Sequence, residues 1–269
     1  MTASPLSGAV AHASPLGGEA ELGRAEFDAI ARIMLAESRV HLTAAKMTLV
    51  HSRLSRRLRE HGLATFRDYV KLVETNPVER GEMVTALTTN HTHFFREVHH
   101  FDHLRETALP MLKDRARRGP VRIWSAACSS GEEIYTVAMC LLGTDRSHAG
   151  WLRGADVKLL ATDISPPMVK ATARGFYPAA TAEAIPEPYR RAWMRPVQGG
   201  FEMVEEARSL VTARLLNLFA DWPMRQQYDV IFCRNVMIYF EDDAKRELEM
   251  RLVDQLAPGG ISISAIPNA

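Results

Sequence analysis

Cysteine is scarce in this chain of 269 residues. There are three, Cys128, Cys140 and Cys233, and no two of them are spaced as a CxxC pair. Isolated cysteines within strand and helix patterns indicate reduced thiols rather than a disulfide framework. We therefore expect a cytosolic protein in which these side chains serve packing.

Long apolar runs and excess charge are missing as well. No stretch of about 18 apolar residues occurs, and no basic region followed by an apolar run stands at the N-terminus, so neither a membrane span nor secretion is indicated. The net charge of +1 excludes a global field that would draw the chain to nucleic acid or membranes. A GxGxxG motif is also absent, which leaves dinucleotide-dependent oxidoreduction as a remote alternative.

The chain is nevertheless large enough to bury a full core, since 46% of its residues are hydrophobic. Residues 1–20 are mostly Ala, Gly, Ser and Pro, and we expect a disordered tail because they cannot offset their own ordering entropy. Apolar residues then recur at helical spacing in four segments, from Arg24 onward and over residues 44–60, 65–73 and 78–87. We predict a small all-helical domain over residues 21–100.

The second part of the chain alternates strands and helices. Residues 101–119 read as a linking helix, and residues 120–269 as an α/β domain. Within that domain, residues 193–216 depart from the alternation: Gly199-Gly200 separates two short segments, which is typical of a hairpin. We expect a small antiparallel insert there, strand-like from Phe201 to Val204.

The most informative stretch is RIWSAACSSGEEIYTVAM, residues 122–139. A short apolar strand leads into small residues and then into an amphipathic helix, which is the opening unit of a Rossmann-like sheet. The small residues let a ligand approach the backbone at the carboxyl end of the strand. Glu132 and Glu133 open the helix, and its dipole keeps them ionised, so they suit a cationic ligand such as S-adenosylmethionine better than a pyrophosphate.

Two further segments point to the same edge of the sheet. Residues 157–164 form a nearly continuous apolar strand that ends in an acid. Asp163 lies where a Rossmann-like domain grips both ribose hydroxyls, and we expect it to hold the adenosine. A third strand, residues 229–233, stops at Arg234 and Asn235.

These segments resemble the CheR family, the methyltransferases that esterify glutamates of bacterial chemoreceptors. The matching residues follow the family's order: ALTTNHTHFFREVHHF (86–101), RIWSAACSSGEEIY (122–135), ATDIS (161–165), NLF (217–219) and CRNVMIYF (233–240). Jointly they are far more specific than a lone strand-to-glycine loop. The resemblance implies a Rossmann-like class I methyltransferase sheet with a small antiparallel β insert, preceded by a small all-helical domain. It implies a protein-glutamate O-methyltransferase of chemotaxis adaptation that uses S-adenosyl-L-methionine and releases S-adenosyl-L-homocysteine.

The resemblance also assigns site residues by position. Arg96 and Tyr239 match the residues that act near the transferred methyl group, with an arginine gripping the substrate carboxylate. The matched cofactor contacts are Asn90, Thr92, Arg96, Glu133, Asp163, Asn217, Leu218, Arg234 and Asn235. Ordinary alternatives exist for single members: Asn90 and Thr92 as helix caps, Arg96 as a surface ion pair, and Tyr239 as a core aromatic.

Residues 46–60 carry a cluster of cations against one acid. Taken alone, this pattern indicates a solvated helix face. The resemblance implies instead that the helical domain docks on the acid-rich helical bundle of a chemoreceptor's cytoplasmic domain, where charge would raise the encounter rate. The implied docking residues are Arg53, Arg56, Arg57 and Arg59. The implied enzyme is cytoplasmic and monomeric, and it neither binds nucleic acid nor inserts into membranes.

Five of the ten histidines fall between residues 91 and 103. His99 and His103 are spaced as a possible metal pair on a helix, but no cysteine and no third clustered acid completes a site, so we predict no metal. His100 matches the histidine of the family's own motif.

The chain departs from the family at its end. After Gly259-Gly260 the family continues with a strand closing on a GHSE-like sequence and a hairpin, whereas this chain reads ISISAIPNA. The resemblance therefore implies an incomplete sheet edge with reduced stability, although every matched cofactor contact precedes it. The loop at Gly199-Gly200 looks short, as in relatives that do not depend on a receptor tether peptide, and we expect tether-independent action.

Two alternatives to the chemotaxis enzyme stay open. One is a methyltransferase of the same family that acts on a non-chemotaxis signalling protein. The other is a non-catalytic module that retains the cofactor pocket as a sensor.

Overall fold

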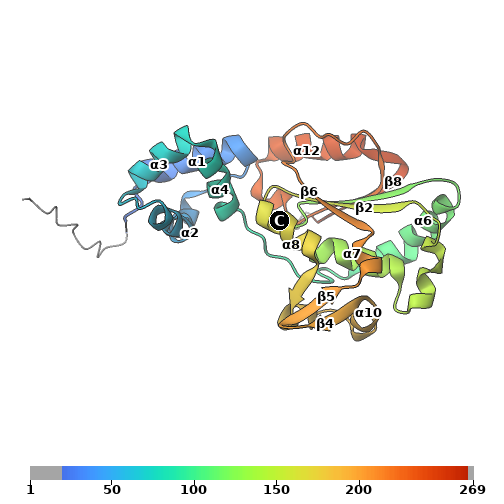
Figure 1. The fold of residues 1–269 in the computed structure, drawn as a ribbon. Coiled ribbons are helices and arrows are strands. Elements are labelled where there is room, and N and C mark those ends of the chain that lie inside the picture. Colours follow the sequence, from blue (N-terminus) through green and yellow to red (C-terminus); the bar gives the residue numbers. More distant parts are fainter. Residues whose placement is uncertain (1–19, 266–269) are drawn as a thin grey trace, which may run out of the picture.

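The computed structural model describes residues 20–265, so nearly all of the expected tail over residues 1–20 lies outside the described part. Its N-terminal part consists of helices that lie together at one end of the molecule (Figure 1). We call this part the helical half, although it is shorter than the rest of the chain. They are α1 (Arg24–Ser38), the short 3-10 helix η1 (Ala44–Lys46), α2 (Met47–Glu60), α3 (Phe66–Thr75) and α4 (Pro77–Leu87). Their buried apolar faces form one cluster of their own, which the helical periodicity predicted.

Local signals set the helix ends. The Thr65 hydroxyl accepts a hydrogen bond from the Asp68 N–H at the start of α3. Asn76 caps α4 in the same way through the N–H groups of Val78 and Glu79, and Pro77 occupies the first helical position, where no N–H is needed. These caps satisfy backbone donors that a helix start otherwise leaves free.

The second half is built on a parallel sheet of five strands in the order β6-β2-β1-β7-β8. The strands are β1 (Val121–Ala126), β2 (Val157–Asp163), β6 (Val211–Leu215), β7 (Tyr228–Arg234) and β8 (Leu256–Ala265). The chain proceeds outward from β1 through β2 to β6, and β7 then returns to the other side of β1. That reversal is a topological switch point, which is where open α/β sheets bind ligands.

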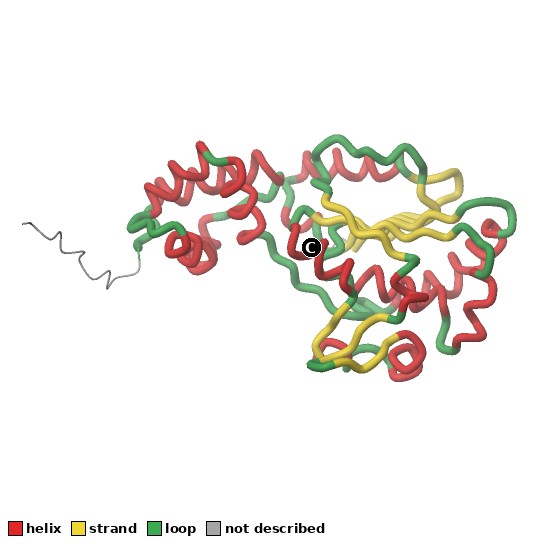
Figure 2. The backbone as a smooth tube through the Cα atoms, in the orientation of Figure 1, coloured by secondary structure: helices red, strands yellow, loops and turns green. Residues whose placement is uncertain are grey.

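Helices cover both faces of this sheet (Figure 2). They are α7 (Glu132–Leu142), α8 (Pro166–Arg174) and α12 (Asp242–Asp254). Successive residues of one strand enter opposite layers: Ile123 of β1 belongs to the cluster that contains α7, and Trp124 to the cluster that contains α12. Burial on both faces explains why these strands read as nearly continuous apolar runs.

The expected linking helix over residues 101–119 does more than join two parts. It is one helical run formed by α5 (His99–His103), the π-helical turn η2 (Leu104–Ala108) and α6 (Leu109–Ala116). Phe101, Leu104 and Leu112 are buried in the same cluster as α7. The run therefore covers one face of the sheet.

A second, antiparallel sheet has the strand order β3-β5-β4. Its strands are β3 (Phe176–Pro178), β4 (Met194–Val197) and β5 (Gly200–Met203). Shorter helical segments complete the fold: η3 (Arg146–Leu152), α9 (Ala179–Ala182), α10 (Glu187–Trp193), α11 (Glu205–Arg208) and η4 (Met237–Tyr239). The predicted hairpin is present, but three details of the prediction were wrong.

The first correction concerns β6, which pairs in parallel with β2 and belongs to the main sheet, not to the insert predicted over residues 193–216. The second concerns β3, an insert strand that sequence reasoning missed. The third concerns the turn: Val197 pairs with Gly200, so the turn is Gln198-Gly199 and β5 starts one residue early. Gly200 is needed because an added Cβ would stand 2.1 Å from the Tyr177 carbonyl oxygen.

At the far edge, β8 pairs with β7 and is an outer strand of the described sheet. The residues with which the chain ends, 266–269, lie outside the described part. Within residues 20–265, no helix combines the length and the apolar character that crossing a membrane would need.

Candidate functional site

A pocket lies at the carboxyl edge of the sheet, where it faces the helical half of the chain. The loops after β1, β2, β6 and β7 line one side, and residues from α1 to the segment after α4 line the other. All nine matched cofactor residues and Tyr239 line this single pocket. The structure thus brings all ten predicted residues to one cavity.

The loop after β1 has an unusual backbone. Ala127 and Ser129 have φ values of 59° and 50°, and Gly131 follows with 95°. A Cβ at Gly131 would stand 2.8 Å from the Thr172 hydroxyl, so glycine is required there. This conformation turns the Ser129 N–H toward the end of β2, where it donates to the Asp163 carboxylate at 2.8 Å.

Asp163 is buried, with 5% of its surface exposed. Its second carboxylate oxygen accepts from the Ser165 N–H at 2.9 Å. Burial raises the pKa of this carboxyl, and the backbone hydrogen bonds oppose the rise. A carboxylate offers about four acceptor positions, so two remain for a ligand in the pocket while the other two hold the loop.

Glu132 and Glu133 have different surroundings. Glu133 lines the pocket, accepts from the Ser125 hydroxyl at 2.8 Å and pairs with Arg234 at 2.9 Å. Glu132 instead lies beneath the loop and accepts from the Ser130 hydroxyl at 2.6 Å. Burial raises the pKa of both carboxyls, and Arg234 opposes the rise for Glu133. The expectation that both glutamates face a cationic ligand is therefore wrong for Glu132.

Arg234 and Asn235, at the end of β7, donate hydrogen bonds to protein partners, although the buried Nε of Arg234 has no partner among the described residues. The Arg234 guanidinium, 1% exposed, pairs with Glu133 and Glu97 and donates to the Arg96 carbonyl. The Asn235 amide donates to Glu97 at 3.0 Å. Glu97 did not stand among the predicted site residues, and its only sequence signal is its place beside Arg96.

Arg96 comes from the segment after α4 that crosses from the helical half to the sheet (Figure 1). One of its guanidinium nitrogens donates to the His91 carbonyl at 2.8 Å, and its Nε lies 3.8 Å from the Glu97 carboxylate. Tyr239, in η4, lines the same pocket, and its carbonyl accepts from the His41 N–H at 2.9 Å. Asn90 and Thr92 lie on the Arg96 segment.

Asn217 and Leu218, after β6, complete the pocket. The Asn217 amide donates to the Glu37 carbonyl at 2.7 Å and its oxygen accepts from the Phe219 N–H at 3.0 Å. The matched cofactor residue therefore also ties the two halves of the chain together. Glu37 and His41 were missed because contacts between remote segments leave no local pattern.

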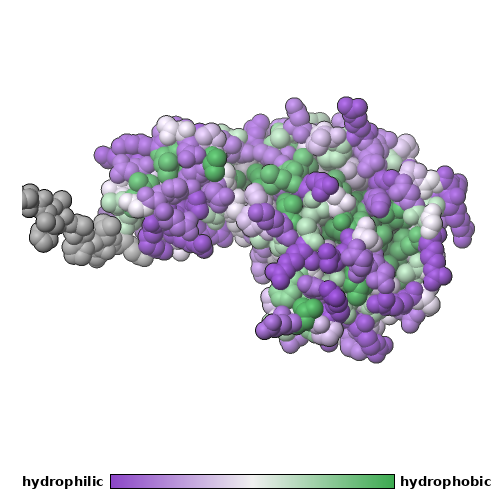
Figure 3. Space-filling model, viewed as in Figure 1, coloured by the Kyte–Doolittle hydropathy of each residue, from purple (hydrophilic) through white to green (hydrophobic). Residues whose placement is uncertain are grey.

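The four cations assigned to receptor docking do not form one free surface. Arg53 donates to the carbonyls of Leu87 and Thr88 at 2.9 and 2.8 Å and so caps the end of α4. Arg57 pairs with Glu79, whose side chain is only 3% exposed. Arg56 and Arg59 are the exposed members, and Arg56 pairs with Glu60 at 2.8 Å. The visible face of this domain carries mainly hydrophilic side chains (Figure 3).

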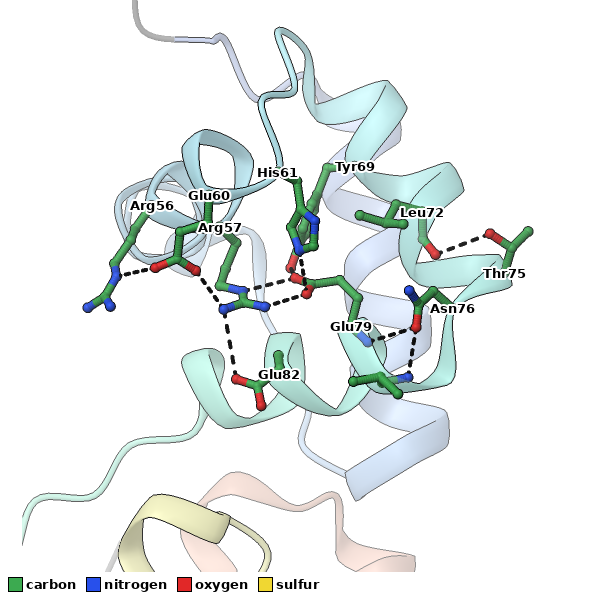
Figure 4. A network of polar contacts seen from close by, with 11 residues as sticks. Arg56, Arg57, Glu60, His61, Tyr69, Leu72, Thr75, Asn76, Glu79 and Glu82 are labelled. Carbon is green, nitrogen blue, oxygen red and sulfur yellow. Dashed lines mark hydrogen bonds and ion pairs between the residues drawn. The ribbon is translucent and has the colours of Figure 1, made fainter.

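Arg57, His61, Tyr69 and Glu79 form a group that we term the Glu79 network (Figure 4). The Glu79 carboxylate accepts from Arg57 at 2.9 Å, from the Tyr69 hydroxyl at 2.8 Å and from His61 at 2.7 Å. Burial would raise the pKa of Glu79, but these hydrogen bonds hold it below its usual value. The hydrogen bond with Glu79 raises the pKa of Arg57.

The metal expectation concerned His99 and His103, which do not line the pocket, whereas the expectation for the thiols includes Cys128, which does. His99 groups with Glu97 and His100, not with His103, and the donor atoms lie within 4.8 Å of one another. Because Glu97 already accepts from Asn235 and Arg234, this group does not argue for a metal. The three cysteines are free and buried, and burial raises the pKa of the Cys140 thiol to about 12.

The pocket fits S-adenosylmethionine in its charges. Glu133 lies at the start of α7, where its carboxylate also pairs with Arg234, and Asp163 lies at the end of β2 with acceptor positions that the Ser129 and Ser165 N–H groups do not use. The parallel sheet, its switch point and these acids define an S-adenosylmethionine-dependent methyltransferase.

The comparisons with known proteins identify the family. Residues 90–263 match the model "CheR methyltransferase, SAM binding domain", and residues 25–88 match "CheR methyltransferase, all-alpha domain". The chain therefore belongs to the CheR methyltransferase family.

Curated relatives match most of the chain. It is 40% identical over 235 residues to a probable chemotaxis protein methyltransferase of Rhizobium etli, which covers 85% of this chain and 86% of the relative. Identity is 39% over 260 residues to chemotaxis protein methyltransferase 2 of Pseudomonas aeruginosa, with 92% and 88% covered. It is 37% over 251 residues to the chemotaxis protein methyltransferase of Escherichia coli, with 89% and 82% covered.

Proposed function

We propose that this protein transfers the methyl group of S-adenosyl-L-methionine to glutamate side chains in the cytoplasmic domain of chemoreceptors. The observation that carries the proposal is that Arg96 and Tyr239 line the same pocket as the acids that suit the cofactor. The relatives named above as chemotaxis protein methyltransferases support the choice of substrate. The product would be a glutamate methyl ester.

Methyl transfer to a carboxylate needs little acid–base catalysis. A glutamate with a pKa of about 4.3 is already a carboxylate nucleophile at pH 7. S-adenosylmethionine supplies an electrophilic methyl group when bound. Arg96 would grip the receptor carboxylate, since the guanidinium is a planar donor fork that suits carboxylates, and would hold it in line with the methyl. Tyr239 would orient the same carboxylate from η4, which follows β7.

Cofactor binding is proposed for the remaining pocket residues. Asp163 would accept hydrogen bonds from the ribose, and Glu133 would face the cationic part of the cofactor. Asn90 and Thr92 would cover it from the segment after α4, and Asn217 and Leu218 would line the adenosine side. Arg234 and Asn235 would contribute chiefly through the contacts that hold neighbouring groups.

Receptor docking is proposed for Arg56 and Arg59, because both are exposed on α2 while Arg53 and Arg57 are occupied within the domain. Long-range attraction to an acidic helical bundle would speed the encounter more than it would tighten the complex. We further propose that the enzyme works in the cytoplasm as a monomer and needs no tether peptide, since the hairpin turn of the insert has only two residues, Gln198-Gly199.

The test is transfer of labelled methyl from the cofactor to a chemoreceptor cytoplasmic fragment, followed by mild alkali. We expect label that alkali releases as methanol and that is absent when the receptor's methylation-site glutamates are replaced by alanine. Label on another signalling protein alone would favour the same-family alternative. Cofactor binding without transfer to any acceptor would favour the non-catalytic module.

A further inference from the structure

We propose that Glu97 is a positioning residue for methyl transfer: its carboxylate, gripped by the end of β7, fixes the backbone on either side of Arg96 and so aims the Arg96 guanidinium into the pocket. This inference rests on the proposed function for its turnover readout. It concerns a residue to which neither the sequence motif nor the resemblance gave a role.

The backbone around Arg96 needs such support. Phe95 and Glu97, its two neighbours, both have a φ of 56°, in the left-handed region. Residues with a Cβ adopt that region at a cost in free energy, and two such residues around one side chain persist only where the surroundings enforce them. The strain therefore marks the point at which the chain is bent to present Arg96.

One side of this bend is held by packing. The Phe95 N–H donates to the Thr136 hydroxyl of α7 at 3.2 Å. The Phe95 ring lies 5.3 Å from the ring of Tyr189 and 5.9 Å from that of Phe101, measured between centroids. These contacts fix the segment before Arg96 but leave its far side to other groups.

Glu97 holds the far side. Its carboxylate accepts from the Asn235 amide at 3.0 Å and lies 3.3 Å from Arg234, which also donates to the Arg96 carbonyl. The same carboxylate lies 3.8 Å from Nε of Arg96 itself, so Glu97 holds the Arg96 side chain as well as its backbone. Arg234 thus contacts both the backbone of Arg96 and the side chain of its neighbour. We term Glu97, Glu133, Arg234 and Asn235 the Arg234 network.

Charge explains why an acid is needed at this position. Arg234 is almost fully buried, and Glu133 and Glu97 are the carboxylates that pair with it. When a buried charge loses one of its partners, the remaining contacts do not offset its desolvation penalty, and the charged group shifts toward other partners. Without Glu97, the guanidinium of Arg234 would be free to move toward the pocket. The segment that carries Arg96 would then lose its contacts with the end of β7 and its fixed position.

The experiment compares the full chain with Glu97→Ala, Glu97→Gln and Arg96→Ala, and with Glu106→Ala as a control on the helical run that follows Glu97, where the side chain is exposed. Turnover is measured on a receptor fragment, and binding of S-adenosyl-L-homocysteine is measured by calorimetry. For Glu97→Ala we expect kcat to fall about 30- to 100-fold, as for a misplaced catalytic group, with less than about a threefold change in product affinity.

Glu97→Gln should recover part of kcat, because its amide oxygen can still accept from Asn235 although the charge is lost. The decisive variant is the double substitution: if Glu97 acts through Arg96, Glu97→Ala should cost nothing further once Arg96 is alanine. Full additivity, an equal loss of kcat and product affinity, or unchanged kcat would each overturn the proposal. Glu106→Ala should match the wild type.

These outcomes separate the two proposals. If the wild-type chain itself methylates no receptor, the proposed function fails whatever Glu97 does. If the wild type is active and Glu97→Gln folds with normal kcat, only the role of Glu97 fails. The unfolding midpoint of each variant, measured without cofactor, identifies any loss that comes from misfolding.

Discussion

Arg57 and Arg234 each donate hydrogen bonds to two glutamates, yet these partners come from very different distances along the chain. Arg57 pairs with Glu79 and Glu60, at sequence separations of 22 and 3, and the Glu79 network stays inside the helical half. Arg234 pairs with Glu133 and Glu97, at separations of 101 and 137. The first arrangement joins adjacent helices, and the second joins the sheet to the segment that carries Arg96.

The comparison shows that the residue types in an ion pair do not reveal whether the pair stabilises the fold or supports the pocket. Both arginines were assigned from motifs, Arg57 to receptor docking and Arg234 to the cofactor, and both use their charge within the protein. Only the Arg234 network borders the pocket. We therefore expect damage to the Glu79 network to lower stability, and damage at the pocket to lower binding or turnover.

The largest effect is expected at Glu79. Glu79→Ala leaves Arg57 without its buried partner, and breaking a buried pair in this way costs about 3 to 5 kcal/mol of unfolding free energy. Urea unfolding measures the loss. Glu82→Ala is the matched control, because Glu82 lies 3.8 Å from Arg57 but is half exposed. Equal losses in the two variants would contradict the assignment.

The same network predicts a pH dependence. The pKa of Glu79 is depressed in the folded state, so the unfolded chain binds more protons between the folded pKa and the usual value near 4.5. Its contribution to stability is therefore present above about pH 4.5 and is lost as the pH falls through the folded pKa. The stability difference between wild type and Glu79→Gln should narrow from pH 6 to pH 3. A constant difference would mean that Glu79 is not ionised in the fold.

Arg96→Ala is expected to have the next largest effect. Loss of the proposed carboxylate grip should lower kcat about 10²- to 10³-fold, as for removal of a preorganised donor. Tyr239→Phe should lose less, because only a hydroxyl is removed. Steady-state kinetics on a receptor fragment, with cofactor affinity measured separately, checks both. Normal turnover at saturation with tenfold weaker cofactor binding would reassign Arg96 to the cofactor.

Asp163→Ala should have a smaller effect, on binding. Loss of hydrogen bonds to a charged group should weaken S-adenosyl-L-homocysteine binding by about 1.5 to 3 kcal/mol, which calorimetry can measure. Because Asp163 also accepts from the Ser129 and Ser165 N–H groups, some loss of stability should accompany it. Unchanged affinity with lowered stability would leave Asp163 a loop anchor alone.

Patterns that repeat within a segment carried the fold prediction. The four helices were predicted because their apolar residues recur at fixed spacing, and the strands β1, β2 and β7 because each is a short, nearly continuous apolar run. The strand β3 was missed because it has three residues and ends in Pro178. The strand β6 was placed in the wrong sheet, since its pairing with β2 is a long-range choice that its own alternation does not encode.

The pocket was predicted for a related reason. Asp163 and Arg234 end strands that are recognisable by themselves, Asn235 directly follows the second of these, and parallel strands bring their carboxyl ends to one edge. Glu37, His41 and Glu97 were not identified, because their partners are separated from them by long stretches of chain. The cations of a basic helix likewise look unpaired in the sequence, because the acids that pair with them can lie on other helices. Arg57, which pairs with Glu79, is an example.

The smallest effect is expected at the exposed cations of α2. Arg56→Gln with Arg59→Gln should slow association with a receptor fragment a few-fold at low salt, worth less than about 1 kcal/mol, because exposed charges are well solvated. Screening acts over about 10 Å at 0.1 M salt, so added salt should reproduce the double variant and abolish the difference. Stability should not change, in contrast to Glu79→Ala. Arg118→Gln with Arg146→Gln removes the same charge from exposed sites outside the helical half and should leave association at the wild-type rate. If both double variants slow association equally, the effect belongs to net charge and the docking role of α2 is wrong.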